Sequence, residues 1–222
     1  AHGKNNAISV IVIAPRNSLL NAPDVYMNKI AIGFDFEERI IDLGISHKEN
    51  LRNIAKAKKC NIDELLVTIL DRPRHEELIA QVRENGAKVK LISDGDIMGI
   101  VDTSVGNSDV YMGIGGAPEG VIAAAALKTY GGQICGKLIF ESEDEISRAQ
   151  KLGIIELDRQ YLMSDLVKDE CLFVATGVTD GDTLSGVKYS KNNVITESLV
   201  LYSGDKMIQK ILTSKKICTN QS

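Results

Sequence analysis

The amino-acid sequence predicts an α/β protein with a mostly parallel β-α-β-α-β-α core that begins near residue 62. Three observations support this prediction. Short apolar runs alternate with segments of helical spacing between residues 62 and 132. The connections between them are short, as in a parallel sheet with helices packed on it. Glycine or proline stands where the helices would start and stop.

The first 60 residues carry weaker signals. The run I-S-V-I-V-I-A at residues 8–14 is continuous and rich in β-branched side chains, which predicts a strand buried on both faces. A proline interrupts the segment from residue 19 to residue 33, so we predict two short strands around a loop that carries Tyr26. A helix follows, and Ser46 is its predicted N-cap.

Strands and helices then alternate in the central part of the chain. The predicted strands cover residues 65–70, 89–92 and 110–114. The first helix has Pro73 at its start and a glycine stop at Gly86, as helix ends favour. The second helix is short, at residues 97–102, and the third is the alanine-rich segment 121–130.

The last third of the chain predicts one more strand and two hairpins. The acidic segment at residues 141–153 precedes a predicted strand at residues 172–175. Residues 187–196 and 198–211 are predicted to form hairpins, with turns at K-N-N and S-G-D. The sequence contains no internal repeat and no linker that would divide it.

Charge and hydropathy argue against two classes of partner. The chain has 26 basic and 30 acidic residues, a formal net charge of −4. Binding to nucleic acid requires a basic face or stripe, which this balance does not provide. No apolar stretch approaches the roughly 18 residues of a membrane helix. We therefore expect neither nucleic acid nor membrane as a partner.

The four cysteines, at positions 60, 135, 171 and 218, lie in or beside apolar segments. They have no C-x-x-C or zinc-ligand spacing, so they read as free thiols. The sequence shows no signal peptide, and we expect a cytoplasmic location. It also lacks an initiator methionine and enters a strand almost at once, so we expect it to be the C-terminal part of a longer protein.

Three loops follow the predicted parallel strands. They are D-R-P-R-H at residues 71–75, S-D-G-D at residues 93–96 and G-I-G-G-A-P-E-G at residues 113–120. Open parallel sheets bind ligands at the carboxyl ends of their strands, so these loops are expected to converge. Their arginines, carboxylates and glycines together suit a phosphorylated, hydroxylated small molecule.

The third loop supports two interpretations. Gly115 and Gly116 permit close backbone approach, and the helix start after them offers free N–H groups to an anion. A tight strand–helix turn with glycines for packing is the alternative. Glu119, in the first helical turn, either interacts with the helix dipole or offers an oxygen ligand to Mg²⁺ or Mn²⁺.

The other candidate residues also allow more than one interpretation. Arg72 and Arg74 either clamp a phosphate or pair with glutamates on the following helix. Asp94 and Asp96 either accept hydrogen bonds from sugar hydroxyls, bind a cation, or form a turn and a helix cap. Tyr26 either donates its hydroxyl to a phosphate or packs half-buried.

Five segments resemble class II fructose-1,6-bisphosphatase, a bacterial family of the lithium-sensitive, inositol-phosphatase-like superfamily. They are L-N-A-P-D-V-Y-M-N-K-I-A-I-G, R-P-R-H-E-E-L-I, S-D-G-D, G-I-G-G-A-P-E-G-V-I-A-A-A-A-L-K and A-T-G-V-T-D-G-D-T-L-S-G-V. The segments occur in family order and cover nearly the whole chain. The resemblance implies Mg²⁺- or Mn²⁺-dependent removal of the 1-phosphate of fructose 1,6-bisphosphate in gluconeogenesis. It also implies a layered α/β/α/β/α fold and a homodimer or homotetramer.

The resemblance also implies roles for individual residues. Glu119 matches the metal-binding glutamate of G-G-A-P-E-G. The residues that match substrate-binding positions of the family are Tyr26, Arg72, Pro73, Arg74, Asp94, Gly95, Asp96 and Gly116. No residue of this chain matches a catalytic position.

The family's other metal carboxylates lie in a G-E-G-E-type segment and a D-P-x-E-G-T motif, and this sequence contains neither. One carboxylate does not build a metal cluster, so we expect the chain alone to be inactive. We expect residues 1–60 to complete a first subdomain and residues 61–222 to form an α/β subdomain that binds substrate and metal. The alternatives are sedoheptulose 1,7-bisphosphate as substrate and a truncated, non-catalytic sugar-phosphate-binding module.

Overall fold

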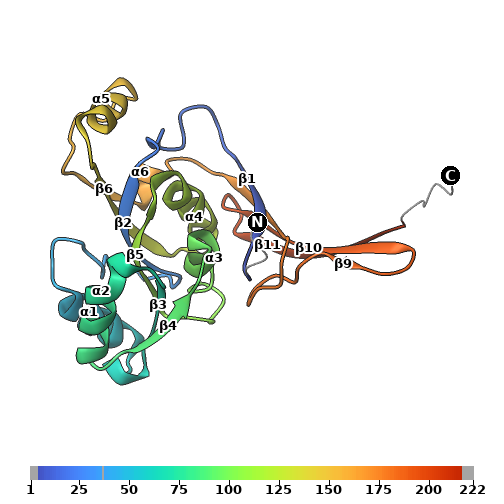
Figure 1. Cartoon of the computed structure of the whole chain (residues 1–222), viewed down its shortest axis with the longest axis horizontal. Helices are drawn as coiled ribbons and strands as arrows, with labels where there is room; N and C mark the ends of the chain where they lie inside the picture. Colours follow the sequence, from blue (N-terminus) through green and yellow to red (C-terminus); the bar gives the residue numbers. More distant parts are fainter. Residues whose placement is uncertain (1–4, 37, 217–222) are drawn as a thin grey trace.

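The computed structural model describes residues 5–36 and 38–216. Two β-sheets face each other with helices between them, and further helices cover the far face of the larger sheet (Figure 1). The described residues thus form four alternating layers of helix, sheet, helix and sheet, which confirms the predicted α/β class. Within residues 5–36 and 38–216, no helix covers the outer face of the smaller sheet.

The larger sheet has six strands in the order β4-β3-β5-β2-β6-β7. Their bounds are β2 Tyr26–Ile32, β3 Leu66–Leu70, β4 Lys88–Ile92, β5 Val110–Gly116, β6 Gln133–Ile139 and β7 Gln160–Leu162. The strands β4, β3 and β5 pair in parallel, which confirms the predicted β-α-β-α-β-α core. β2 pairs antiparallel with β5 on one side and β6 on the other, so the sheet as a whole is mixed.

The helices α1 to α4 begin and end close to the predicted signals, whereas α5 and α6 were not predicted. They are α1 His47–Lys58, α2 Glu76–Glu84, α3 Asp96–Val101, α4 Ala117–Tyr130, α5 Glu143–Lys151 and α6 Met163–Leu166, with short 3₁₀ turns at Ile62–Glu64 and Pro73–His75. Ser46 caps α1, because its Oγ accepts the Glu49 N–H at 3.2 Å and its own N–H donates to the Glu49 carboxylate at 3.0 Å. α4 ends at Gly131, whose φ of +77° is readily adopted by glycine.

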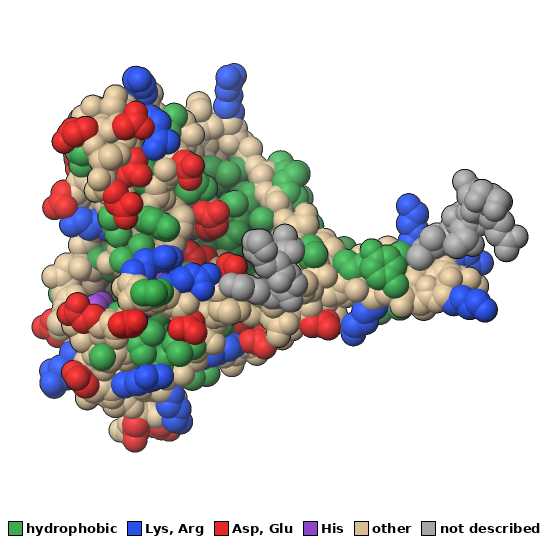
Figure 2. Space-filling view, in the orientation of Figure 1, with side chains coloured by type: hydrophobic (Ala, Val, Ile, Leu, Met, Phe, Trp, Pro, Cys, Tyr) green, Lys and Arg blue, Asp and Glu red, His purple; other side chains and the backbone are tan. Residues whose placement is uncertain are grey.

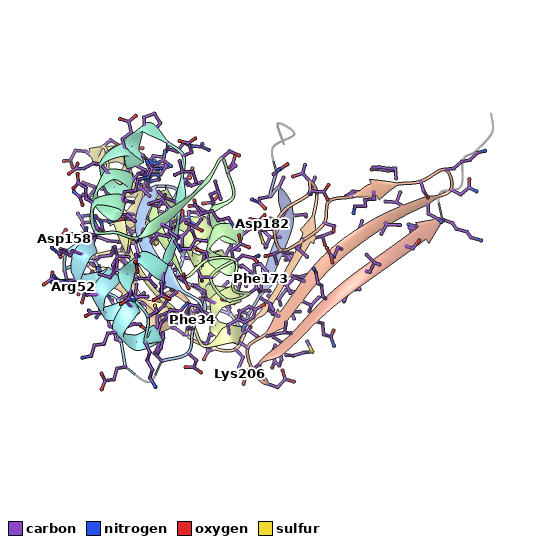
Figure 3. All side chains as sticks on the ribbon, turned by 90° about the horizontal axis from the view of Figure 1, so that it is seen from below. Phe34, Arg52, Asp158, Phe173, Asp182 and Lys206 are labelled. Carbon is purple, nitrogen blue, oxygen red and sulfur yellow. The ribbon has the colours of Figure 1, made fainter. Side chains whose placement is uncertain are left out.

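The smaller sheet is antiparallel, in the order β1-β8-β10-β11, with the short strand β9 beside β10. The bounds are β1 Ile8–Ile13, β8 Leu172–Gly177, β9 Lys188–Tyr189, β10 Asn193–Tyr202 and β11 Met207–Lys216. The two predicted hairpins are confirmed and share β10. The distal parts of β10 and β11 project beyond the body of the molecule (Figures 1 and 3).

Two predictions for individual strands were wrong, and the strand β6 was missed. β1 is not buried on both faces, because no helix of the described residues covers the outer face of the smaller sheet, and Ile11 and Ile13 on that face are 56% and 55% exposed. The segment 19–33 contains one strand, β2, instead of the two that were predicted. Pairing with a strand on each side keeps β2 continuous after the proline. β6 was not predicted, and it follows the glycines that end α4.

Each sheet draws strands from both sides of residue 60. β1 joins β8 in the smaller sheet, and β2 lies between β5 and β6 in the larger sheet. The division between the sheets therefore does not fall at residue 60. The division of the chain into two subdomains, residues 1–60 and 61–222, stays a prediction.

The alanine-rich helix α4 lies between the two sheets, and residues 123–127 within it are fully buried. A helix that is apolar on every side is typical of such a central position. Its small side chains allow close packing by Phe173 of β8, which points from the smaller sheet toward the helices (Figure 3). Tyr111 of β5 belongs to the same core, whereas α1 and α2 pack on the opposite face of the larger sheet.

The described part of the chain contains no helix long and apolar enough to cross a membrane. Cys60, Cys135 and Cys171 are free thiols, and burial raises the pKa of each. Cys218 lies outside the described residues.

Close packing of α3 against the larger sheet predicts the effect of Gly99→Ala. The added Cβ would lie 2.7 Å from Ile92 Cδ1 and 3.3 Å from the Tyr111 ring. We expect the substitution to lower the free energy of unfolding by about 1–3 kcal/mol, measured by urea denaturation. Ile92→Val removes the Cδ1 atom, so the double variant should lose less stability than the two single losses combined. Fully additive losses would contradict the contact.

Candidate functional site

A pocket of about 600 Å³ opens where the loops after β3, β4 and β5 meet. The three loops thus converge at the carboxyl ends of the parallel strands. The site residues predicted from the sequence that line the pocket are Tyr26, Arg72, Arg74, Asp94, Gly95, Asp96, Gly116 and Glu119. Pro73 does not line the pocket. It lies between the two arginines and is the first residue of the 3₁₀ turn Pro73–His75.

Tyr26 reaches the pocket because β2 runs antiparallel to β5. The register places Tyr26, the first residue of β2, opposite Gly116, the last residue of β5. The start of β2 therefore lies at the same sheet edge as the ends of β3 and β5. Tyr26 lines the pocket there and is 40% exposed.

Two glycines of the third loop make room for two carboxylates. Gly116 is the N-cap of α4, and Glu119 lies in the first turn of this helix. A Cβ at Gly116 would lie 1.9 Å from Glu119 Oε2, and a Cβ at Gly115 would lie 1.6 Å from Asp96 Oδ2. Neither carboxylate could keep its position beside a larger residue. The pair of glycines is therefore required by the side chains around the pocket, whether or not a ligand approaches the backbone.

A buried polar network holds Asp96. Lys29 Nζ donates to Asp96 Oδ2 at 2.6 Å and to the Gly116 carbonyl at 3.0 Å, and the Tyr111 hydroxyl donates to Asp96 Oδ1 at 2.6 Å. Burial lowers the pKa of Lys29, and the negative charge of Asp96 opposes this shift. Burial also raises the pKa of Tyr111 well above its usual value. Both oxygens of Asp96 are therefore engaged at the pocket wall.

Both arginines line the pocket. Figure 2 shows basic and acidic side chains interspersed over the body of the molecule. The Arg74 guanidinium lies 4.9 Å from the centre of the Tyr26 ring, and its Nε and Nη2 donate to the Ile114 carbonyl at 3.1 and 2.8 Å. Arg72 Nη2 is 3.9 Å from Asp94 Oδ2. Within the described residues, neither arginine pairs with the glutamates of α2.

His75 also forms a hydrogen bond to the end of β5. Its Nδ1 lies 2.8 Å from the Leu70 carbonyl, and its Nε2 accepts the Ile114 N–H at 2.8 Å. These partners require a proton on Nδ1 and none on Nε2. His75 is 1% exposed, and burial lowers its pKa. A neutral His75 thus joins the end of β3 to the end of β5.

The sequence did not point to two residues that shape the site. Asn6 lines the pocket and holds the T-D-G-D loop, because its N–H donates to the Asp180 carbonyl at 3.0 Å and its Oδ1 accepts the Asp182 N–H at 3.2 Å. No local pattern marks Asn6. Lys29 was also missed, although it is a lysine on a face of β2 that is otherwise apolar.

Glu119 is the one predicted metal ligand, and the described residues do not group it with enough other ligands to hold a metal ion. In residues 5–36 and 38–216, no three His, Cys, Asp or Glu side chains are grouped so that they could hold a metal ion. Mg²⁺ prefers about six oxygen ligands in octahedral geometry, and Asp96 is already bonded to Lys29 and Tyr111. The described residues therefore do not form a complete metal centre.

The bonding of His75 predicts a dependence of stability on pH. Because the folded-state pKa is lowered, stabilisation is complete above the unfolded value of about 6.5 and is lost as the pH falls below it. Urea unfolding at a series of pH values should show this loss. His75→Asn should reduce the dependence, whereas the control His47→Asn should retain it. An equally steep profile for His75→Asn would contradict the assignment.

Comparison with known proteins agrees with these motifs. A family model described as bacterial fructose-1,6-bisphosphatase, glpX-encoded, matches residues 1–215. The chain is 38% and 37% identical, over 221 residues, to the D-fructose 1,6-bisphosphatase class 2/sedoheptulose 1,7-bisphosphatases of Trichodesmium erythraeum and Crocosphaera subtropica. Each alignment covers 93% of this chain and 64% of the relative, so the chain spans less than two thirds of these relatives' length. The match over residues 1–215 shows that the chain belongs to the bacterial, glpX-encoded fructose-1,6-bisphosphatase family.

Proposed function

We propose that the whole protein is a phosphoric monoester hydrolase that removes the 1-phosphate of fructose 1,6-bisphosphate and yields fructose 6-phosphate for gluconeogenesis. The observation that carries the proposal is the pocket at the strand ends. There, two arginines, a helix N-terminus and several carboxylates meet in about 600 Å³, in a chain of this family. This volume lies in the range of about 300–1,000 Å³ that is usual for small-molecule sites.

In this proposal, Arg72 and Arg74 bind a phosphate group of the substrate. A guanidinium matches phosphate oxygens with two parallel hydrogen bonds, and the free N–H groups at the start of α4 add further donors. The proposed substrate-binding residues also include Tyr26, Pro73, Asp94, Gly95, Asp96 and Gly116, of which all but Pro73 line the pocket. Pro73 contributes by setting the backbone between the arginines, and Asp94 is the exposed carboxylate available to a sugar hydroxyl.

The proposal includes a divalent cation, Mn²⁺ or Mg²⁺, with Glu119 as one ligand. Such a cation activates water and stabilises charge on the phosphoryl oxygens. Among residues 5–36 and 38–216, no three His, Cys, Asp or Glu side chains are grouped to complete its coordination. A homodimer or homotetramer is part of the same proposal.

Sedoheptulose 1,7-bisphosphate is the second candidate substrate. The relatives from Trichodesmium erythraeum, Crocosphaera subtropica and Synechococcus elongatus carry both bisphosphatase activities in their names. This sugar is one carbon longer and presents the same kinds of phosphate and hydroxyl groups. The pocket contacts described here suit both sugars.

The first test is phosphate release from both sugar bisphosphates by the native-length protein, with Mn²⁺ or Mg²⁺. We expect release that stops when the metal is chelated, and the ratio of the two kcat/KM values identifies the preferred substrate. Binding of fructose 1,6-bisphosphate without release would indicate the non-catalytic binding module instead. If the protein neither binds nor hydrolyses either sugar bisphosphate, the proposal is refuted.

Glu119→Gln tests the metal ligand. The substitution keeps the shape of the side chain beside Gly116 but removes its charge, so we expect kcat/KM in the native-length protein to fall by about 100-fold or more. Glu84→Gln, at the exposed end of α2, is the matched control and should leave kcat/KM unchanged. Normal turnover by Glu119→Gln would remove Glu119 from the metal site.

Arg72→Met and Arg74→Met test the phosphate clamp. Each variant removes charge-assisted hydrogen bonds, so we expect KM for the sugar bisphosphate to rise by about 10- to 100-fold, with a smaller change in kcat. Arg83→Met in the last turn of α2 removes an exposed guanidinium outside the pocket and serves as the control. If KM for both pocket variants matches that of Arg83→Met, the phosphate lies elsewhere.

A further inference from the structure

Lys29 is a buried cation to which the proposed chemistry assigns no role. It lies on β2 between Met27 and Ala31, on the face that packs toward α3 and α4, and its side chain is 0% exposed. A buried charge is costly unless it is paired and its N–H groups are bonded. The partners of Lys29 are therefore obligatory, and they determine which parts of the molecule this lysine joins.

The ammonium group of Lys29 joins the starts of two helices. Asp96, its ionic partner at 2.6 Å, is the first residue of α3 and the last residue of the D-G-D segment. Gly116, whose carbonyl it binds at 3.0 Å, is the N-cap of α4. Asp96 and Gly116 both line the pocket, whereas Lys29 itself does not.

A second cation holds the same strand end at a neighbouring carbonyl. Arg74 donates two hydrogen bonds to the Ile114 carbonyl, two residues before Gly116. The end of β5 is thus held by Arg74, which faces the pocket, and by Lys29, which lies behind it. Glu119 follows in the first turn of α4, and its carboxylate fits beside Gly116 because this residue has no side chain.

We propose that Lys29 is a positioning residue, which fixes the D-G-D loop and the start of α4 at the separation needed to bind a phosphorylated sugar, without touching that sugar. The proposal rests on the proposed function, because it takes the pocket as the binding site for a phosphate ester. Lys29 acts through the Asp96 carboxylate and the Gly116 carbonyl. Its loss should loosen the phosphate-binding groups more than it alters the chemistry.

Lys29→Met in the native-length protein is the direct test, since it retains the apolar stem and removes the ammonium group. We expect KM for the sugar bisphosphate and the Kd for inorganic phosphate to rise by about 10- to 100-fold, with a smaller change in kcat. Lys29→Gln keeps a hydrogen-bond donor and should show smaller increases.

Ile54→Ala controls for instability alone. Ile54 is fully buried in the core between α1 and the larger sheet, away from the pocket, so this variant should lower the melting temperature and leave KM and Kd unchanged. If Lys29→Met lowers the melting temperature but leaves KM and Kd at the wild-type values, Lys29 is purely structural and the proposal is wrong.

Tyr111→Phe keeps the proposal testable if Lys29→Met does not fold. It removes the other hydrogen bond to Asp96 and leaves the ion pair in place, and we expect the Kd for phosphate to rise by about fivefold. An unchanged Kd in both Tyr111→Phe and Lys29→Gln would overturn the proposal. The phosphate measurement also separates the two hypotheses: absence of turnover in the wild type refutes the proposed function, while the Kd values still decide the role of Lys29.

Discussion

The buried ion pair between Lys29 and Asp96 joins the elements around which the pocket forms. Removing two charges from water costs free energy that their attraction offsets only when the remaining polar atoms are also bonded. Here Tyr111 bonds the second Asp96 oxygen, and the Gly116 carbonyl accepts another proton of the ammonium group. The pair also depends on Gly115, since a Cβ there would occupy the position of Asp96 Oδ2. One physical requirement, the burial of an ion pair whose polar atoms are all bonded, therefore explains the lysine in β2, the pair of glycines and the second aspartate of D-G-D.

The mixed topology of the larger sheet is what makes this ion pair possible. A purely parallel sheet collects loops at its carboxyl edge, as β3, β4 and β5 do here. Because β2 is inserted antiparallel beside β5, its amino end reaches that same edge and brings Tyr26 and Lys29 with it. The pocket thus combines loop residues from the parallel strands with side chains from a rigid strand. Such a strand holds side chains more firmly than a loop does.

The pocket contains the groups to which the proposed function assigns sugar-phosphate binding, whereas the described residues do not form a complete metal centre. Arg72 and Arg74, the start of α4 and the D-G-D segment lie together, whereas Glu119 has no grouped carboxylates in the described part of the chain. The resemblance leads to the same expectation, because it places the family's other metal carboxylates in G-E-G-E-type and D-P-x-E-G-T motifs, which this sequence does not contain. Binding of a sugar phosphate and its hydrolysis should therefore be measured separately for this protein.

Local signals in the sequence were enough to predict the β-α-β-α-β-α core, the cap at Ser46, the glycine after α4 and the gathering of the loop residues. These features depend on neighbouring residues and on the general rule that parallel strands end at one edge. The continuity of β2, the strand β6 and the one-sided burial of β1 depend on which strands pair, so only the tertiary structure decided them. The same holds for Asp96: its motif suggested a ligand for sugar or metal, but Lys29, 67 positions earlier, engages its carboxylate. Local sequence patterns do not encode which distant charge will meet a buried one, because that pairing exists only after the sheet has formed.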